Sequence, residues 1–171
     1  MPEHFEPFES PTANAFNGAA HNPCARFTED KSVRRGEAGD YPYVCTTYSV
    51  TEHWQSGTQT RNIPWLNELV PCNFIELSEE LAKEKGIKTG DDVRVWNNRG
   101  SVVVKAMVTI RMQPMQVNGK LTHVVGMPHH FSWATKLATG DNVNDLTPNV
   151  GDPNSYIPEY KAFLVNIEKA A

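Results

Sequence analysis

The pattern of apolar and polar positions predicts a chain built mainly from β-strands. Residues 41–48, YPYVCTTY, are rich in aromatic, Val and Thr residues, which favour strands. Residues 91–96, DDVRVW, alternate with a period of two, as a half-buried strand does. The turn NNRG and the Val-rich run 101–110 follow, so these two strands form a hairpin. Three further short strands are predicted at 73–77, 121–126 and 162–167.

Helical signals are few. Ser78 has the features of an N-cap, Glu79 and Glu80 suit the positive end of the helix dipole, and Gly86 ends the helix. Residues 64–69, PWLNEL, predict one helical turn, with Pro where its missing N–H costs nothing. About six strands with one or two short helices suggest a mainly β fold that closes as a barrel.

The pattern also divides the chain. Residues 1–40 carry scattered Pro and Gly without a period, so we interpret them as an extended arm that comes from a preceding part of a longer chain. Residues 41–171 form the barrel domain. Within it, 49–62 and 127–160 are long polar loops, and such loops are usually either functional or disordered. Both loops contain aromatic residues and His, which argues against disorder.

Composition excludes several classes of protein. The 16 Lys and Arg residues are balanced by 20 Asp and Glu, and no basic run indicates nucleic-acid binding. The apolar runs are far too short to span a membrane, and the acidic, Pro-rich start is not a signal peptide. The three Cys residues are widely spaced without a CxxC motif, so no self-contained zinc or iron–sulfur site is expected. Buried thiols are the common outcome for such residues, and a disulfide remains open.

The loop 49–62, SVTEHWQSGTQTRN, carries many hydrogen-bonding groups. Its Ser, Thr and Gln side chains can donate or accept, and Gly57 allows the backbone to approach a ligand closely. Arg61 offers a planar fork suited to phosphate, while His53 and Trp54 could stack on a ring. The loop therefore suggests a cradle for a phosphate-bearing heterocycle. A solvated connection with a capping Thr is the alternative.

The loop 127–160 repeats the combination of His and aromatic residues in PHHFSW. Adjacent His residues point in different directions in most backbones, so His129 and His130 do not predict a two-His metal site. Packing against neighbouring aromatic rings is the alternative role for both.

Three further residues in this part of the chain suit a heterocyclic or phosphorylated ligand. Asn144 lies in an Asn-rich run that is typical of turns, although Asn also recognises mixed donor and acceptor edges. Tyr160 and Lys161 lie at the entry to the last strand, where Lys161 either neutralises a phosphate or is a surface lysine. No nucleophile–base pair is evident, so no catalytic residue and no metal ligand is predicted.

Three stretches together resemble a known family: YPYVCTTYSVTEHWQSGTQTRN, GIKTGDDVRVWNNRGSVVVKAMVT and NDLTPNVGDPNSYIPEYKAFLVNIEKA. They are similar to the C-terminal domain of the molybdopterin-dinucleotide oxidoreductases, and above all to the catalytic (alpha) subunit of periplasm-facing formate dehydrogenases. The start, PEHFEPFESP, is similar to the segment that leads into that domain, so the resemblance covers nearly the whole chain. GIKTGDDVRVWNNRG marks the superfamily, whereas MPHHFSWA and PEYKAFLVN are more specific.

The resemblance implies a double-psi β-barrel and a ligand, bis(molybdopterin guanine dinucleotide) carrying molybdenum or tungsten. In the family, preceding domains supply the Cys or selenocysteine that ligates the metal, the catalytic His and Arg, and an iron–sulfur cluster. The implied partners are the remainder of the catalytic subunit and an iron–sulfur electron-transfer subunit. The resemblance implies a periplasmic enzyme, with a cytoplasmic one as the alternative. This chain alone is then not expected to oxidise formate to CO2.

The resemblance also assigns cofactor contacts by position. They are Thr46, Tyr48, Ser49, His53, Trp54, Gln55, Ser56, Gly57, Thr58, His129, His130, Asn144, Tyr160 and Lys161, with Trp133 as a further candidate. Some relatives have an Arg-Glu pair where this chain has Ser49-Val50, so contacts there are either made by the backbone or absent.

Two other interpretations remain open. One is the equivalent domain of another molybdenum or tungsten oxidoreductase, of the nitrate or thiosulfate reductase type. The other is a non-enzymatic double-psi barrel that binds a protein partner. The second would not require the loops 49–62 and 127–161 to line one groove, and loops at opposite ends of the barrel would favour it.

Overall fold

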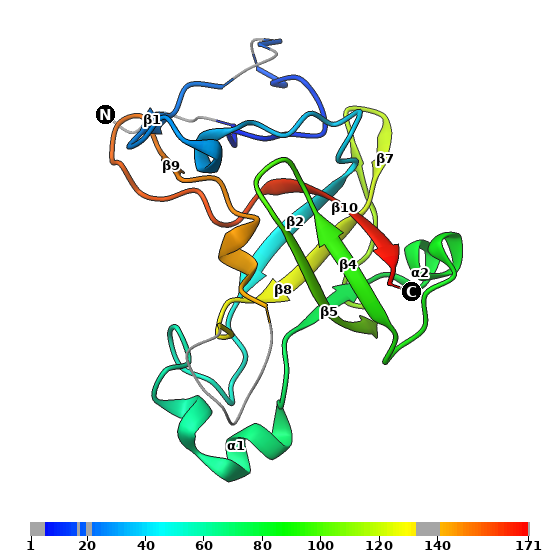
Figure 1. The fold of residues 1–171 in the computed structure, drawn as a ribbon. Coiled ribbons are helices and arrows are strands. Elements are labelled where there is room, and N and C mark those ends of the chain that lie inside the picture. Colours follow the sequence, from blue (N-terminus) through cyan, green and yellow to red (C-terminus); the bar gives the residue numbers. More distant parts are fainter. Residues whose placement is uncertain (1–5, 17, 20–21, 133–140, 171) are drawn as a thin grey trace.

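A closed barrel forms the centre of the computed structural model (Figure 1). The structure describes residues 6–16, 18–19, 22–132 and 141–170. In their order around the barrel, the strands are β10 (Phe163–Lys169), β2 (Tyr43–Tyr48), β8 (Val124–Pro128), β3 (Phe74–Leu77), β5 (Ser101–Val108) and β4 (Asp92–Trp96). Each strand that the sequence pattern predicts has a counterpart among these six.

The strand directions give the barrel an internal pseudo-twofold symmetry. β2 and β8 are parallel, as are β3 and β5, whereas every other neighbouring pair is antiparallel. Exchanging β2, β3 and β4 with β5, β8 and β10 leaves this pattern of neighbours unchanged. A six-stranded barrel with one parallel pair in each half is the double-psi arrangement, so the predicted mainly β fold is confirmed.

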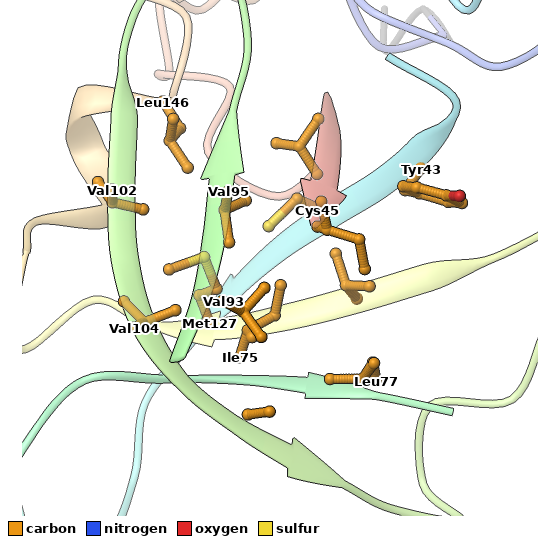
Figure 2. Close-up of a cluster of buried hydrophobic side chains, with 14 of the residues drawn as sticks. Tyr43, Cys45, Ile75, Leu77, Val93, Val95, Val102, Val104, Met127 and Leu146 are labelled. Atoms are coloured by element: carbon orange, nitrogen blue, oxygen red, sulfur yellow. The ribbon is translucent and has the colours of Figure 1, made fainter. Parts of the chain in front are cut away.

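The core follows directly from the alternation of residues along the strands. In β4 and β5 every second residue is buried, including Val93, Val95, Val102 and Val104. Figure 2 shows these side chains meeting Ile75 and Met127 inside the barrel. Val is well suited to such positions, because its branched side chain packs on a pleated surface.

The two α-helices form where their capping signals lie. α2 (Glu79–Lys85) begins at Ser78, whose Oγ accepts a hydrogen bond from the Leu81 N–H at 3.1 Å. It ends at Gly86, which has a φ of 65°, a conformation that favours glycine. α1 (Pro64–Leu69) has Pro in its first turn, as the sequence predicts.

The sequence pattern does not predict the shortest elements. They are β1 (Ala25–Arg26), η1 (Lys31–Val33), η2 (Thr60–Asn62), β6 (Met115–Val117), β7 (Lys120–Thr122), η3 (Val143–Asp145) and β9 (Val150–Gly151). The single strand predicted at 121–126 is wrong in detail, since β7 and β8 separate at His123 and pair with different partners. Strands of two or three residues are too short to show a period.

The arm is tied to the barrel by a buried carboxylate. Glu9 is 1% exposed and forms an ion pair with Arg99, which lies in the turn between β4 and β5. The same carboxylate accepts the N–H groups of Gly36 and of Leu164 at the start of β10. Figure 1 shows the arm, in blue, passing beside this part of the barrel. One side chain therefore joins the arm, the turn and β10.

The described residues contain neither a membrane-spanning helix nor a metal-binding cluster. No helix there is long and apolar enough to cross a membrane. Nor do those residues contain a group of three or more His, Cys, Asp or Glu side chains arranged to hold a metal ion. The three cysteines, Cys24, Cys45 and Cys72, are free thiols.

Replacing Glu9 by Gln should strongly destabilise the fold, because it leaves the buried Arg99 guanidinium without a negative partner. We expect the free energy of unfolding to fall by about 3–5 kcal/mol, measured by urea denaturation followed by circular dichroism. Glu168→Gln is the matched control, since Glu168 pairs with Arg94 and both side chains are about half exposed. That change should cost less than about 1 kcal/mol. Equal effects of the two substitutions would contradict the role given to Glu9.

Candidate functional site

Strand directions bring the candidate segments to one end of the barrel. β2 and β8 are parallel, so the loops that follow both strands leave from the same end. β10 is antiparallel to β2, so the segment before β10 lies there too. The His129 N–H donates to the Tyr48 carbonyl at 3.2 Å, and the Lys161 Nζ donates to the Thr47 carbonyl at 2.6 Å. The loop 49–62 therefore lies beside residues 129–132 and 160–161.

His130 joins the two loops from inside. Its Nε2 accepts the Val50 N–H at 2.9 Å, which leaves Nδ1 to donate to the Gln55 carbonyl. The side chain is fully buried, with 0% exposed. Both ring nitrogens are therefore used within the protein, and His130 holds the loop rather than facing a ligand.

His53 has a similar internal position. Its Nε2 donates to the Val70 carbonyl at 3.0 Å, so its Nδ1 can accept from the Thr60 hydroxyl at 3.2 Å. The buried ring packs edge-on against Phe131, with 5.3 Å between the ring centroids. The two histidines thus stabilise the contact between the loops.

Arg61 lies inside the same contact instead of presenting its fork to solvent. It is fully buried and donates to the Ser132 carbonyl at 2.8 Å, to the Ser132 hydroxyl at 2.9 Å and to the Ser56 carbonyl at 3.4 Å. Burial lowers the pKa of its guanidinium. The side chain that the sequence suggested for phosphate therefore joins the loop to residue 132.

Gly57 is a packing requirement of this contact. Its φ is 77°, and a Cβ at this position would lie 2.1 Å from the His130 carbonyl oxygen. No side chain fits there without moving one of the loops. Its role is therefore to let the two backbones approach each other.

The other candidate residues of the first loop face outward. Trp54 is 59% exposed, and Ser49, Gln55, Ser56 and Thr58 are exposed as well. Gln55 has a φ of 52°, and its carbonyl points inward to His130. These side chains form the polar rim of the loop.

Thr46 and Tyr48 lie on the outer face of β2, where both are half-buried. The Tyr48 ring packs close to Gly126 of β8. Burial raises the pKa of the Tyr48 hydroxyl, and the nearby Glu76 raises it further. The Tyr48 carbonyl accepts the His129 N–H at the site, whereas the Tyr48 side chain packs on the outside of the barrel.

Tyr160 and Lys161 form the second exposed part of the site. The Thr47 hydroxyl donates to the Tyr160 carbonyl at 2.9 Å, and Lys161 reaches the Thr47 carbonyl, so the end of β2 fixes both residues. They line a cavity of about 230 Å³. His129 is half-buried nearby, and burial lowers its pKa, as does the charge of Lys161.

Asn144 lies apart from these groups. It is exposed in η3 and lines a second cavity, of about 420 Å³, with Gly100 and Ser101. β4 runs in the same direction as β2, so the turn that precedes Ser101 lies at the same end of the barrel. Trp133 lies outside the described residues.

The sequence pattern did not single out Thr47, Ser132 and Phe131 as parts of the site. Alternation along β2 could have placed Thr47 inside, but nothing local indicates its partner 113 residues later. Ser132 and Phe131 lie within the HHFSW motif, where the His and Trp residues are the more typical ligand-binding types.

Comparisons with known proteins agree with one another. The family model described as "Molydopterin dinucleotide binding domain" matches residues 43–164. Formate dehydrogenase subunit alpha of Megalodesulfovibrio gigas is 48% identical over 99% of this chain. The nitrate-inducible formate dehydrogenase major subunit of Escherichia coli (strain K12) is 44% identical over 99%. The chain spans 17% of the length of each of these relatives.

Among solved structures, acetylene hydratase from Pelobacter acetylenicus has a similar fold. The TM-score is 0.60 at 16% identity, over 78% of this chain and 19% of that chain. At this identity the likeness supports the barrel fold alone.

Gly57→Ala should separate the two loops. Gly119→Ala is the matched control, because Gly119 has the same φ of 77° and no described heavy atom would lie within 4 Å of a Cβ added there. The control should lose only the backbone cost of about 1–2 kcal/mol. Gly57→Ala should lose about 1–3 kcal/mol more through its clash with the His130 carbonyl. Urea unfolding of both variants measures the difference, and equal losses would contradict the packing role of Gly57.

Acid should loosen the same contact. Burial lowers the pKa of His130 below its usual 6.5, so the folded state favours the neutral ring. Near pH 6.5 the unfolded chain therefore binds more protons than the folded protein does. The stability that is present above this pH is lost as the pH falls. We expect the free energy of unfolding to decrease between about pH 7.5 and 5.5, and to decrease less in His130→Gln. An unchanged pH dependence in that variant would contradict the assignment.

Proposed function

The chain belongs to the family of molybdopterin dinucleotide binding domains, and we propose that it holds bis(molybdopterin guanine dinucleotide) within the alpha subunit of a formate dehydrogenase. The proposal is supported by relatives named as formate dehydrogenase alpha or major subunits, which match along 99% of the chain. Because the chain spans 17% of their length, the oxidation of formate to CO2 is proposed for the whole subunit and not for this chain alone.

The observation that carries the proposal is the meeting of two distant polar loops at one end of the barrel. The buried histidines of both loops form their hydrogen bonds within the protein. Other donors and acceptors of the loops face solvent. The pterin and guanine rings have mixed donor and acceptor edges, which Gln and Ser side chains match. A diphosphate favours N–H groups and a lysine, and Lys161 lies at the same end. The described residues therefore fit such a ligand.

The site residues divide into two roles. Trp54, Gln55, Ser56 and Thr58 would contact the cofactor through side chains, together with Ser49, His129, Tyr160 and Lys161. His53, His130 and Gly57 would act by holding the loop, and Thr46 and Tyr48 through the end of β2. Asn144 would contact a part of the dinucleotide remote from Lys161, since it lines the other cavity.

The Lys161 ammonium has a defined orientation for such a contact. Thr47 provides it with two acceptors, its carbonyl at 2.6 Å and its hydroxyl at 3.4 Å. An ammonium has three N–H donors, so one remains for a phosphate oxygen. Thr47 thus orients the cation that would neutralise the ligand.

The bound molybdenum or tungsten cofactor supplies the two-electron chemistry, and this chain binds and orients it. In this proposal, other domains of the subunit provide the Cys or selenocysteine at the metal, the catalytic His and Arg, and an iron–sulfur cluster. An iron–sulfur subunit accepts the electrons, and the enzyme faces the periplasm. The adjacency of the loops favours this function over a partner-binding barrel, and the named relatives favour formate over nitrate or thiosulfate.

Lys161→Gln should weaken cofactor binding in the complete catalytic subunit that contains this chain. Loss of one charge-assisted hydrogen bond corresponds to about a tenfold or larger increase in the dissociation constant. Guanine nucleotide released by acid and metal retained after gel filtration measure the effect. Lys169→Gln is the matched control, because Lys169 lies at the other end of β10 and pairs with Asp91.

Equal cofactor retention by these two variants would contradict the proposed site. Formate-dependent reduction of an artificial electron acceptor should fall in proportion to cofactor content. The 171-residue chain alone should show no such turnover, and sustained activity by it would overturn the proposed division between domains.

A further inference from the structure

The segment that carries Tyr160 and Lys161 lies outside the barrel strands. It runs from Glu159, whose N–H donates to the Val150 carbonyl of β9 at 3.1 Å, to the start of β10 at Phe163, and residues 160–162 between them belong to no strand. A segment of this kind needs other contacts to hold one conformation. Thr47 supplies one from within the barrel, at the Tyr160 carbonyl.

The N-terminal arm supplies two more. The Phe8 N–H donates to Glu159 Oε2 at 2.7 Å, and the Leu164 N–H donates to Glu9 Oε2 at 2.6 Å. Two consecutive arm residues therefore hold positions on either side of Lys161. We call this pair of contacts the arm clamp.

The arm is anchored firmly enough to serve as a support. Phe8 is 3% exposed and packs with Val33 and Val150 in a small separate core. Glu9 is held by Arg99 and by the Gly36 N–H. The arm clamp thus connects the segment that carries Lys161 to two buried clusters.

The arm also lines the cavity beside Lys161. Glu6 and Pro7 form one part of its lining, and the rest comes from Asp152 and residues 158–162. A ligand in this cavity of about 230 Å³ would touch both. We propose that the arm residues Glu6 and Pro7 are a wall of the cofactor site, held there by Phe8 and Glu9, and that Glu159 is a positioning residue that sets the direction of the Lys161 ammonium. The identity of the ligand rests on the proposed function, whereas the positioning does not.

The chemistry of the clamp indicates which substitutions will test it. Burial raises the pKa of Glu159, and the Phe8 N–H opposes this change. Since only an acceptor is needed, a neutral Gln can replace the carboxylate, whereas Ala removes the acceptor. Asp keeps the charge but is one methylene shorter, so it cannot reach Phe8 without moving the segment.

Acylation of lysines in the 171-residue chain tests the positioning without any cofactor. Lys161 should react slowly with an N-hydroxysuccinimide ester, because its Nζ is bonded to the Thr47 carbonyl. Glu159→Ala should raise its rate about fivefold, the factor equivalent to one ordinary hydrogen bond. Glu159→Asp should raise the rate as well, and Glu159→Gln should leave it within about twofold of the original.

Lys169 in the same molecule is the internal control, read by the same peptide mass spectrometry. Its rate should not change, since it pairs with Asp91 at the far end of β10. An unchanged Lys161 rate in both Glu159→Ala and Glu159→Asp would overturn the proposal. Equal acceleration of Lys161 and Lys169 would also overturn it, because that result indicates general loosening of the fold.

Cofactor retention in the complete catalytic subunit separates this inference from the proposed function. If both hold, Glu159→Ala lowers retention about fivefold, and Glu159→Gln restores it. A faster Lys161 reaction with unchanged retention would leave the positioning intact and contradict the cavity as a cofactor site. Unchanged reactivity with a normal loss of cofactor in Lys161→Gln would contradict the positioning and leave the proposed function intact.

Discussion

The parallel pairing of β2 with β8 is the constraint on which the site depends. Parallel neighbours end at the same edge, so the loops that follow them must meet although they are about eighty residues apart in the sequence, as the Val50–His130 contact shows. The antiparallel placement of β10 beside β2 then adds Tyr160 and Lys161 to the same end. An antiparallel pairing of β2 and β8 would send the two loops to opposite ends of the barrel.

Once the loops meet, the cost of burying polar groups decides which residues remain for a ligand. His53, His130 and Arg61 are buried, and each has protein acceptors or donors within the loop contact. Unsatisfied, such groups would strongly destabilise the fold. Because both imidazoles are satisfied internally, the backbone beneath the exposed side chains of the rim is held in place by the protein itself.

Much of this fold was predictable, and the reason is local. Alternation along β4 and β5 reports one buried face, and Ser78 and Gly86 mark the ends of α2 through caps that involve neighbouring residues. The same reasoning cannot assign partners that are distant in sequence. An imidazole in a polar loop suits a ligand and a loop contact equally well, so His53 and His130 were expected at the cofactor, and only the folded geometry gives their hydrogen bonds. Glu9 and Arg99 are 90 residues apart, and neither the sequence around Glu9 nor that around Arg99 indicates that the two side chains pair.

The arm clamp has a consequence for the order in which the molecule assembles. Its two hydrogen bonds join residues that are 151 and 155 positions apart. Contacts of such sequence separation pay the entropy of closing a long loop before they contribute any stability, so they are among the slowest to form. The pairing of β2 with β10 already joins residues at least 118 positions apart, from Phe163 with Cys45, so closing the arm clamp costs little loop entropy beyond that of closing the barrel. The arm clamp can therefore form together with the barrel rather than as a separate late step.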